Sequence, residues 1–276
     1  MVAPAPVAVV TGAGSGIGLA IARELSSRGY RVLLTDVDKA RLAEAAAPLG
    51  GWAERLDVRD GAACAAIAAQ AADQPGGLAL WVNNAGILAT GPSWTHGEDT
   101  RRRVVEVNAL GAMNGTLAAL DVMRSAGRGH VINIVSLAGL IAAPGETVYA
   151  ASKHALLAFS LGTLADLRAA GELSVHISCL CPDGVWSPML YDKLTDDGAA
   201  ASFTGTLLLP EQVARRVAWL AAHPRPVLAL PRWRGAQVRL LAAFPRLSIP
   251  ATRLVLGLGR ARQRRYAARI AAGRWP

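Results

Sequence analysis

Short apolar runs alternate with segments of helical periodicity along most of the chain. The runs lie at about 7–12, 31–36, 54–58, 78–86, 129–136, 174–182 and 226–231. Helical segments are predicted between them at 17–28, 38–47, 60–72, about 98–126, around 147–155 and at 210–222. Continuous apolar strands separated by helices are typical of a parallel sheet covered on both faces. The pattern therefore predicts an α/β fold, a doubly wound parallel sheet of about seven strands.

The pattern changes near Pro231. Residues 232–276 contain eleven of the 29 basic residues, all arginines, and no acidic residue, whereas the preceding chain carries 18 basic and 20 acidic side chains. Pro245 and Pro250 divide this tail into two predicted helical pieces, at about 236–244 and 251–272. We expect a sheet domain at 1–231 and an arginine-rich helical extension at 232–276.

Composition narrows the class of protein. With 276 residues, 52% hydrophobic and 18% charged, the chain can build a sizeable core. Its three cysteines form no plausible disulfide framework or metal site, which favours a reducing, cytoplasmic setting. The N-terminus lacks the basic segment and apolar run of a secretion signal, and no window of about 20 apolar residues predicts a transmembrane helix.

The stretch TGAGSGIG at 11–18 lies where the first predicted strand turns into the first helix. Glycines there allow backbone N–H groups and the helix N-terminus to face a pyrophosphate. The second strand ends in Asp36, whose carboxylate can accept hydrogen bonds from the adenosine ribose and would repel a 2′-phosphate. Neither Ser15 nor Val37 supplies a cation for that phosphate, and Asp38 is better placed to cap the next helix. The loop predicts NAD(H) in preference to NADP(H).

The stretch TVYAASKHA at 147–155 places Tyr149 and Lys153 four residues apart, on one face of a helix. This spacing is necessary for proton transfer between a phenol and substrate but is common in ordinary helices. The spacing alone therefore does not predict a catalytic pair, and other motifs in the chain are needed.

Those motifs resemble the short-chain dehydrogenase/reductase family over about residues 6–230. Glycines are spaced Gly12-x-x-x-Gly16-x-Gly18, and the further motifs are LDV at 56–58, NNAG at 83–86, EVNALG at 106–111 and GHVINIVSLAG at 129–139. Tyr149 follows Ser136 by 13 residues, as in that family. The resemblance implies a Rossmann-like sheet and an enzyme that interconverts a secondary alcohol and a ketone with a nicotinamide cofactor.

The resemblance also implies catalytic roles for four residues. Tyr149 is the implied general acid/base, and Lys153 would lower its pKa and hold the nicotinamide ribose. Ser136 would donate a hydrogen bond to the substrate oxygen, and Asn108 would hold a water in a proton relay. The alternatives are that Ser136 caps a strand end and that Asn108 is a satisfied polar group of its helix.

Other residues are implied to bind the cofactor. They are Gly12, Gly14, Ser15, Gly16, Ile17, Gly18, Asp36, Val37, Asp57, Val58, Asn84, Ala85, Gly86, Tyr149, Lys153, Pro182, Gly184, Val185 and Ser187. The stretch CPDGVWSPM departs from the family pattern, because Asp183 stands where a glycine is usual and Ser187 where a threonine is usual. The Ser187 hydroxyl can still hydrogen-bond a carboxamide, whereas Asp183 leaves the local backbone geometry open.

The substrate is predicted to contact the loops around the catalytic residues. The predicted contacts are Leu88, Leu140, Ala142, Trp186, Met189 and Leu190. Because few of these loop residues are charged, we expect a bulky, apolar alcohol or ketone of steroid-, terpenoid- or lipid-like type. The alternative is that several of these side chains only pack a lid.

The tail and the assembly leave several hypotheses open. The interleaved apolar residues and arginines of the tail suit a helix on an anionic membrane surface, a subunit contact or an extension folded over the catalytic domain, whereas nucleic-acid binding is less favoured. The family forms homodimers or homotetramers. A non-catalytic NAD-binding regulatory or scaffold protein is the alternative function, against which the set Asn108, Ser136, Tyr149 and Lys153 argues. The glycine spacing argues against a sugar-nucleotide epimerase or dehydratase.

Overall fold

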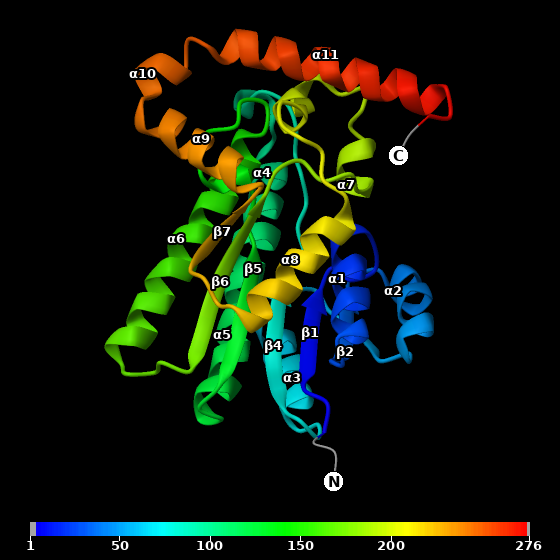
Figure 1. Cartoon of the computed structure of the whole chain (residues 1–276), viewed down its shortest axis with the longest axis vertical. Helices are drawn as coiled ribbons and strands as arrows, with labels where there is room; N and C mark the ends of the chain where they lie inside the picture. Colours follow the sequence, from blue (N-terminus) through cyan, green and yellow to red (C-terminus); the bar gives the residue numbers. More distant parts are fainter. Residues whose placement is uncertain (1–3, 275–276) are drawn as a thin grey trace.

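The computed structural model describes residues 4–274 as one parallel sheet flanked by helices (Figure 1). The strands are β1 (Val7–Thr11), β2 (Arg31–Asp36), β3 (Ala53–Arg55), β4 (Leu78–Asn83), β5 (Gly129–Ile134), β6 (Val175–Pro182) and β7 (Val227–Leu230). They form a seven-stranded sheet in the order β3-β2-β1-β4-β5-β6-β7, in which neighbouring strands are parallel. The predicted doubly wound α/β fold is confirmed.

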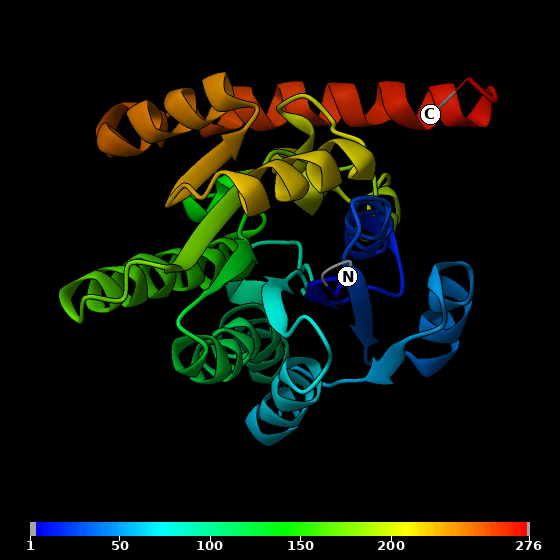
Figure 2. The same cartoon turned by 60° about the horizontal axis from the view of Figure 1, so that its bottom comes forward.

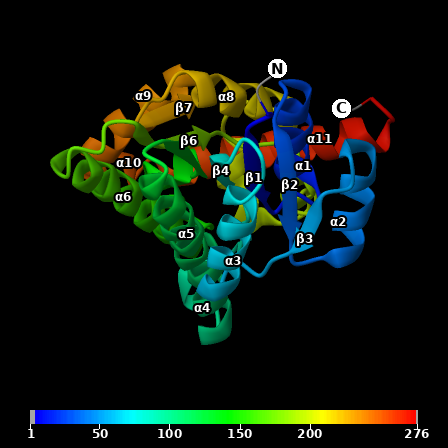
Figure 3. The same ribbon diagram turned by 90° about the horizontal axis from the view of Figure 1, so that it is seen from below.

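Helices cover both faces of this sheet (Figures 2 and 3). The first face carries α1 (Gly16–Ser27), α2 (Lys39–Ala46) and α8 (Pro210–Ala222), and the second carries α3 (Gly61–Ala72), α5 (Gly111–Ser125) and α6 (Thr147–Ala169). Alternate residues of β1 serve the two cores: Ala8 and Val10 pack with α1 and α8, while Val7 and Val9 pack with α3 and α5. Burial on both faces explains why the strands are continuously apolar.

The order of strands reverses between β1 and β4. Strands β2 and β3 extend the sheet on one side of this pair, and β5, β6 and β7 extend it on the other. Such a reversal opens a crevice beyond the carboxyl ends of the strands, where doubly wound proteins bind ligands. The glycine loop after β1 and the segment after β4 both begin at that edge.

Two elements differ from the sequence prediction. Strand β3 ends at Arg55, so Asp57 and Val58 lie in the following loop, where Asp57 Oδ1 accepts the Arg59 backbone N–H at 3.0 Å and turns the chain. The single helix expected at 98–126 consists of α4 (Glu98–Val105), a π-helical turn (Glu106–Leu110) and α5. Asn108 lies within that turn, a helical irregularity often found at functional sites.

The tail folds over the carboxyl edge of the sheet (Figures 1 and 2). It comprises α9 (Arg232–Ala243), α10 (Pro245–Ser248) and α11 (Thr252–Ala271), so its first helix begins directly after β7 rather than at 236. Helix α11 is fixed by Gln263, whose side chain is buried and donates to the carbonyls of Lys193 at 2.7 Å and Asp196 at 2.9 Å. Of the hypotheses for the tail, the extension over the catalytic domain is thus realised in the structure.

Helices in the described part of the chain, residues 4–274, include none that is both long enough and apolar enough to cross a membrane.

Candidate active site

A cavity of about 650 Å³ lies at the carboxyl edge of the sheet. It extends from the glycine loop to Ser136, Tyr149 and Lys153, and the tail helices form its roof. This volume is in the range that holds a small ligand or cofactor.

The glycine loop turns tightly between β1 and α1. Gly12 and Gly16 have φ angles of 63° and 53°, a left-handed conformation that favours glycine. A Cβ atom on Gly12 would lie 2.8 Å from the Ala85 Cα, and one on Gly18 would overlap the Gly12 carbonyl oxygen. The glycines therefore let the loop pack directly against the segment after β4, and leave the N-terminus of α1 open toward the cavity.

Asn84 joins that segment to the loop. Its side-chain Nδ2 donates to the carbonyls of Thr11 at 3.0 Å and Gly12 at 3.1 Å. The Thr11 hydroxyl in turn accepts the backbone N–H groups of Asn84 and Ala85. These bonds fix the two sides of the crevice relative to each other.

Asp36 lies at the far end of the cavity. Its Oδ2 accepts the Gly14 N–H and its Oδ1 accepts the Asp38 N–H, each at 3.0 Å. Asp38, by contrast, caps α2 by accepting two backbone N–H groups of its first turn. The carboxylate of Asp36 is thus free of a capping role and lines the cavity with a fixed orientation. Together with the glycine loop it could hold the ribose and pyrophosphate of a dinucleotide.

The end of β5 and the start of α6 bring together three of the predicted catalytic residues. Lys153 Nζ donates to the Ile134 carbonyl at 2.8 Å and lies 5.7 Å from the centre of the Tyr149 ring. Ser136 hydrogen-bonds Tyr149 and also accepts the Ala138 N–H at 3.1 Å. Ser136 therefore caps the turn after its strand and faces the cavity as well.

The electrostatics of this group differ from the expectation. Burial raises the pKa of Tyr149 above that of a free phenol, the nearby Glu146 carboxylate raises it further, and the hydrogen bond with Ser136 lowers it by less. Burial also lowers the pKa of Lys153 to about 8. In the protein alone, the ammonium of Lys153 does not offset burial, so Tyr149 is a protonated phenol at neutral pH and a proton donor.

Asn108 lies behind the cavity wall. Its side chain is buried, with Oδ1 accepting the Ile87 N–H at 2.8 Å and Nδ2 donating to the Ile87 carbonyl at 2.9 Å and the Ser152 hydroxyl at 3.1 Å. It does not line the cavity. In this structure Asn108 holds the loop after β4 against α6, and its role toward a water stays a prediction.

The structure separates the other predicted residues into two groups. The predicted cofactor residues line the cavity except Gly14 and Gly18, which support the loop from behind. Leu88, Ala142, Met189 and Leu190 line it near the catalytic group. Leu140 and Trp186 do not: Leu140 packs in the core cluster around Val135 and Leu156, and the Trp186 ring packs on Tyr191 with centroids 5.3 Å apart. These two side chains pack against neighbours in the structure, and their contact with a substrate stays a prediction.

Asp183, the residue that departs from the family pattern, pairs with the tail. Arg234 Nε lies 3.0 Å from Asp183 Oδ2, and both side chains are mostly buried. A Cβ atom on Gly205 would overlap this carboxylate, so Gly205 makes room for it. Asp183 Oδ1 also accepts the Gly184 N–H at 3.0 Å. Asp183 has no positive φ in the structure, and its side chain anchors α9 to the end of β6.

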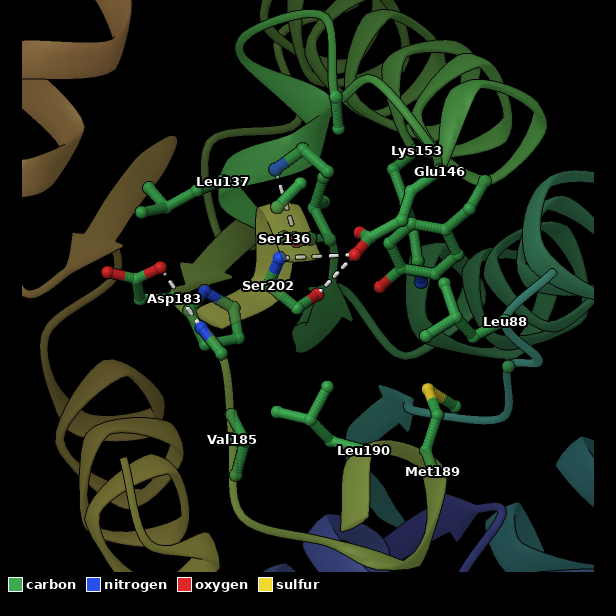
Figure 4. Close-up of a pocket in the computed structure, with 18 of the residues that line it drawn as sticks. Leu88, Ser136, Leu137, Glu146, Lys153, Asp183, Val185, Met189, Leu190 and Ser202 are labelled. Atoms are coloured by element: carbon green, nitrogen blue, oxygen red, sulfur yellow. Dashed lines mark hydrogen bonds between the residues drawn. The ribbon is translucent and has the colours of Figure 1, made fainter. Parts of the chain in front are cut away.

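Glu146 is a cavity residue that sequence reasoning missed. Its buried carboxylate accepts the backbone N–H of Ser202 at 3.2 Å and the Ser202 hydroxyl at 2.7 Å (Figure 4). Burial raises its pKa to about 7, against the lowering effect of the Ser202 hydrogen bonds. Nothing in the stretch PGETVY distinguishes this glutamate from an exposed loop residue, because its burial depends on the distant segment around Ser202.

The roof of the cavity was also missed. From the tail, the lining residues are Arg234, Gln237, Val238, Leu241, Ser248, Ile249, Ala251, Thr252, Val255, Leu256, Leu258 and Arg262. The inward face of α11 is formed by Thr252, Leu256, Gly259 and Gln263, of which only Leu256 is a large apolar residue, so hydrophobic periodicity does not reveal it.

The sequence is similar to a family model and to curated oxidoreductases. The family model described as short chain dehydrogenase matches residues 6–198. The putative oxidoreductase SadH of Mycobacterium tuberculosis is 36% identical over 197 residues, which cover 70% of this chain and 71% of that protein. The 1-deoxy-11-beta-hydroxypentalenate dehydrogenase of Streptomyces exfoliatus is 36% identical over 200 residues, covering 70% and 72%.

Solved structures agree with this comparison. A short chain dehydrogenase/reductase from Burkholderia phymatum in complex with NAD is 31% identical, with a TM-score of 0.79 over 90% of this chain and 96% of that one. A variant of the actinorhodin polyketide ketoreductase with NADPH is 29% identical, with a TM-score of 0.72 over 82% and 95%.

Proposed function

Because the chain belongs to the short chain dehydrogenase family, we propose that it transfers a hydride between NAD(H) and the reacting carbon of a bulky, apolar secondary alcohol or ketone. Family membership makes the chain an oxidoreductase with a nicotinamide cofactor. One observation carries the proposal: Ser136, Tyr149 and Lys153 line the same cavity as the glycine loop and Asp36.

In this proposal Tyr149 moves the proton. The bound nicotinamide supplies or accepts the hydride. The protonated phenol of Tyr149 donates its proton to the oxygen of the ketone as negative charge develops there, and the Ser136 hydroxyl donates a hydrogen bond to the same oxygen. Lys153 keeps a positive charge beside the phenol below a pH of about 8. Because the pKa of Tyr149 is raised, alcohol oxidation, which needs the phenolate, becomes faster as the pH rises.

Asp36 supports the preference for NAD(H). Two backbone N–H groups, of Gly14 and Asp38, hold its carboxylate in place at the end of the cavity. A 2′-phosphate at that position would meet a fixed negative charge, whereas a ribose hydroxyl would donate a hydrogen bond to it. Similar structures hold either NAD or NADPH, so the residue at this position is the feature on which the proposal rests.

The cavity walls support an apolar substrate. Leu88, Met189 and Leu190 line the cavity from the sheet domain, and Leu241 and Leu256 line it from the tail. Apolar walls with a few convergent polar groups favour a large ligand that buries most of its surface. We propose substrates of steroid-, terpenoid- or lipid-like size, and note that one relative is named for 1-deoxy-11-beta-hydroxypentalenate and one similar structure is a polyketide ketoreductase.

Assembly and location are part of the same proposal. We expect a homodimer or homotetramer in the cytoplasm, on the basis of the family alone. Light scattering on the purified chain measures its mass directly.

A panel of alcohols tests the proposed function. The purified protein is mixed with NAD or NADP and alcohols that range from small and polar to steroid-sized, and formation of the reduced cofactor is followed. We expect turnover with NAD that increases with the apolar size of the alcohol. Binding of NADH without turnover of any alcohol or ketone would instead identify a non-catalytic NAD-binding protein.

A further inference from the structure

Large apolar side chains gather on the outer surface of the tail. Besides Trp233 at the start of α9, six of them are each more than half exposed: Leu240, Phe244, Leu247, Ile249, Leu254 and Leu258. We call these residues the tail corner, since they lie in α9, in α10, directly after each of these helices, and in the first turns of α11, where the tail turns back across the molecule (Figure 1). Outside the tail, apolar side chains this exposed are scattered singly along the described chain, as at Trp94 and Leu173. Exposed apolar side chains that are concentrated in one part of a fold mark a contact site.

Arginines alternate with the tail corner. Arg239, Arg246 and Arg253 are exposed and each directly precedes a leucine of the corner. Within the described residues none of these three arginines forms a salt bridge, unlike Arg234 and Arg260 of the same tail. Since residues 232–276 contain no acidic side chain, the surface joins apolar area to uncompensated positive charge.

The tail corner also borders the mouth of the cavity. Ile249 and Leu258 of the tail corner also line the cavity. The neighbouring Leu241 and Val255 line the cavity too, and their side chains are about two-fifths exposed. Side chains that line a cavity and are exposed at the same time stand at its opening. One opening of the cavity therefore lies at the apolar surface of the tail.

From these observations we infer that the tail corner docks on an anionic phospholipid surface and that lipid-dissolved substrate enters the cavity from the bilayer. Exposed leucines and phenylalanine enter the boundary between head groups and acyl chains, while arginines pair with lipid phosphates. A second copy of the chain that packed its tail against this one would cover the apolar side chains but leave the arginines facing arginines. The substrate route rests on the proposed function, whereas the docking does not.

Vesicle sedimentation tests the docking directly. Full-length protein is mixed with vesicles of phosphatidylcholine alone or with one quarter phosphatidylserine. The variant carries Leu247→Glu and Leu254→Glu, two exposed positions that do not line the cavity. The matched control carries Trp94→Glu and Leu173→Glu, which add the same charge elsewhere. We expect wild type and control to bind anionic vesicles at least tenfold more strongly than the variant does. We also expect wild type and control to bind neutral vesicles more weakly than anionic vesicles.

Kinetics then test the route of entry. For a steroid-sized alcohol carried in the vesicles, we expect the variant to show at least a fivefold higher KM, with an unchanged KM for a water-soluble alcohol. A wild type that ignores anionic vesicles, or a variant that binds them equally, overturns the docking. If neither wild type nor the variant binds vesicles, and the variant forms a smaller oligomer than wild type, the tail corner is a subunit interface. If no alcohol is oxidised at all, sedimentation still decides the docking.

Discussion

Arg234 Nε lies 3.0 Å from Asp183 Oδ2, and this ion pair joins the tail to the end of β6. The exposed fractions of the two side chains are 14% and 7%, so solvent screens the pair only weakly. Two departures from the family pattern, the aspartate in place of a glycine and the long tail, are therefore one structural feature. Through this contact the end of β6 at Pro182, and Gly184 in the loop that follows it, are coupled to the tail helices that roof the cavity.

Breaking this pair should destabilise the protein. We expect Arg234→Leu to lower the free energy of unfolding by roughly 3 kcal/mol, because it leaves a buried carboxylate without its partner. Asp183→Gly combined with Arg234→Leu should recover at least half of that loss, since neither charge is then buried alone. Urea unfolding of wild type, both single variants and the double variant measures the coupling, with exposed Arg232→Leu as the control. Equal losses in Arg234→Leu and Arg232→Leu would show that the pair contributes nothing.

Replacing Asp36 should change the choice of cofactor. We expect Asp36→Ser to raise kcat/KM with NADP(H) by about tenfold or more, because a charge that repels the 2′-phosphate is removed, and to lower kcat/KM with NAD(H) by a similar factor. Asp38→Ser is the matched control, because serine keeps the capping of α2 while removing a carboxylate two residues away. A variant at 36 that retains the wild-type ratio would mean that another residue selects the cofactor.

Glu146 should make stability depend on pH. Burial raises its pKa from 4.5 to about 7, so the folded state holds a proton that the unfolded chain has released between these values. The stabilisation by protonated Glu146 is complete below pH 4.5 and is lost as the pH rises through about 7. Relative to Glu146→Gln, wild type should lose about 2–3 kcal/mol of unfolding free energy between pH 5 and pH 8. Urea unfolding of both proteins at these two pH values measures this loss. A difference in unfolding free energy that is the same at both pH values would contradict the raised pKa of Glu146.

Local sequence was sufficient for the sheet and for the residues near strand ends. Continuous apolar runs identify buried parallel strands, and residues such as Asp36 and Ser136 follow those strands to one edge of the sheet. The position of Tyr149 on α6 follows from helical spacing in the same way. These inferences succeed because each depends on a single element and on its place in the order of strands.

Features that depend on contacts between distant segments could not be predicted in this way. Glu146 is buried only because Ser202 lies against it, and Asp183 is satisfied only by Arg234. Leu140 and Trp186 lie in loops near the catalytic residues, and only the structure shows that each packs against neighbours. The direction of the pKa shift of Tyr149 also depends on burial and on Glu146, which spacing does not reveal.

The variant Tyr149→Phe tests whether Tyr149 transfers the proton. Phenylalanine keeps the ring but removes the oxygen that donates the proton in ketone reduction and accepts it in alcohol oxidation. Turnover is measured with the alcohol that wild type oxidises fastest, and NADH affinity is measured by fluorescence titration. We expect Tyr149→Phe to have a kcat about a thousandfold or more below that of wild type, and an NADH affinity within about threefold of wild type. A Tyr149→Phe variant that binds NADH normally and keeps most of its turnover would contradict the account.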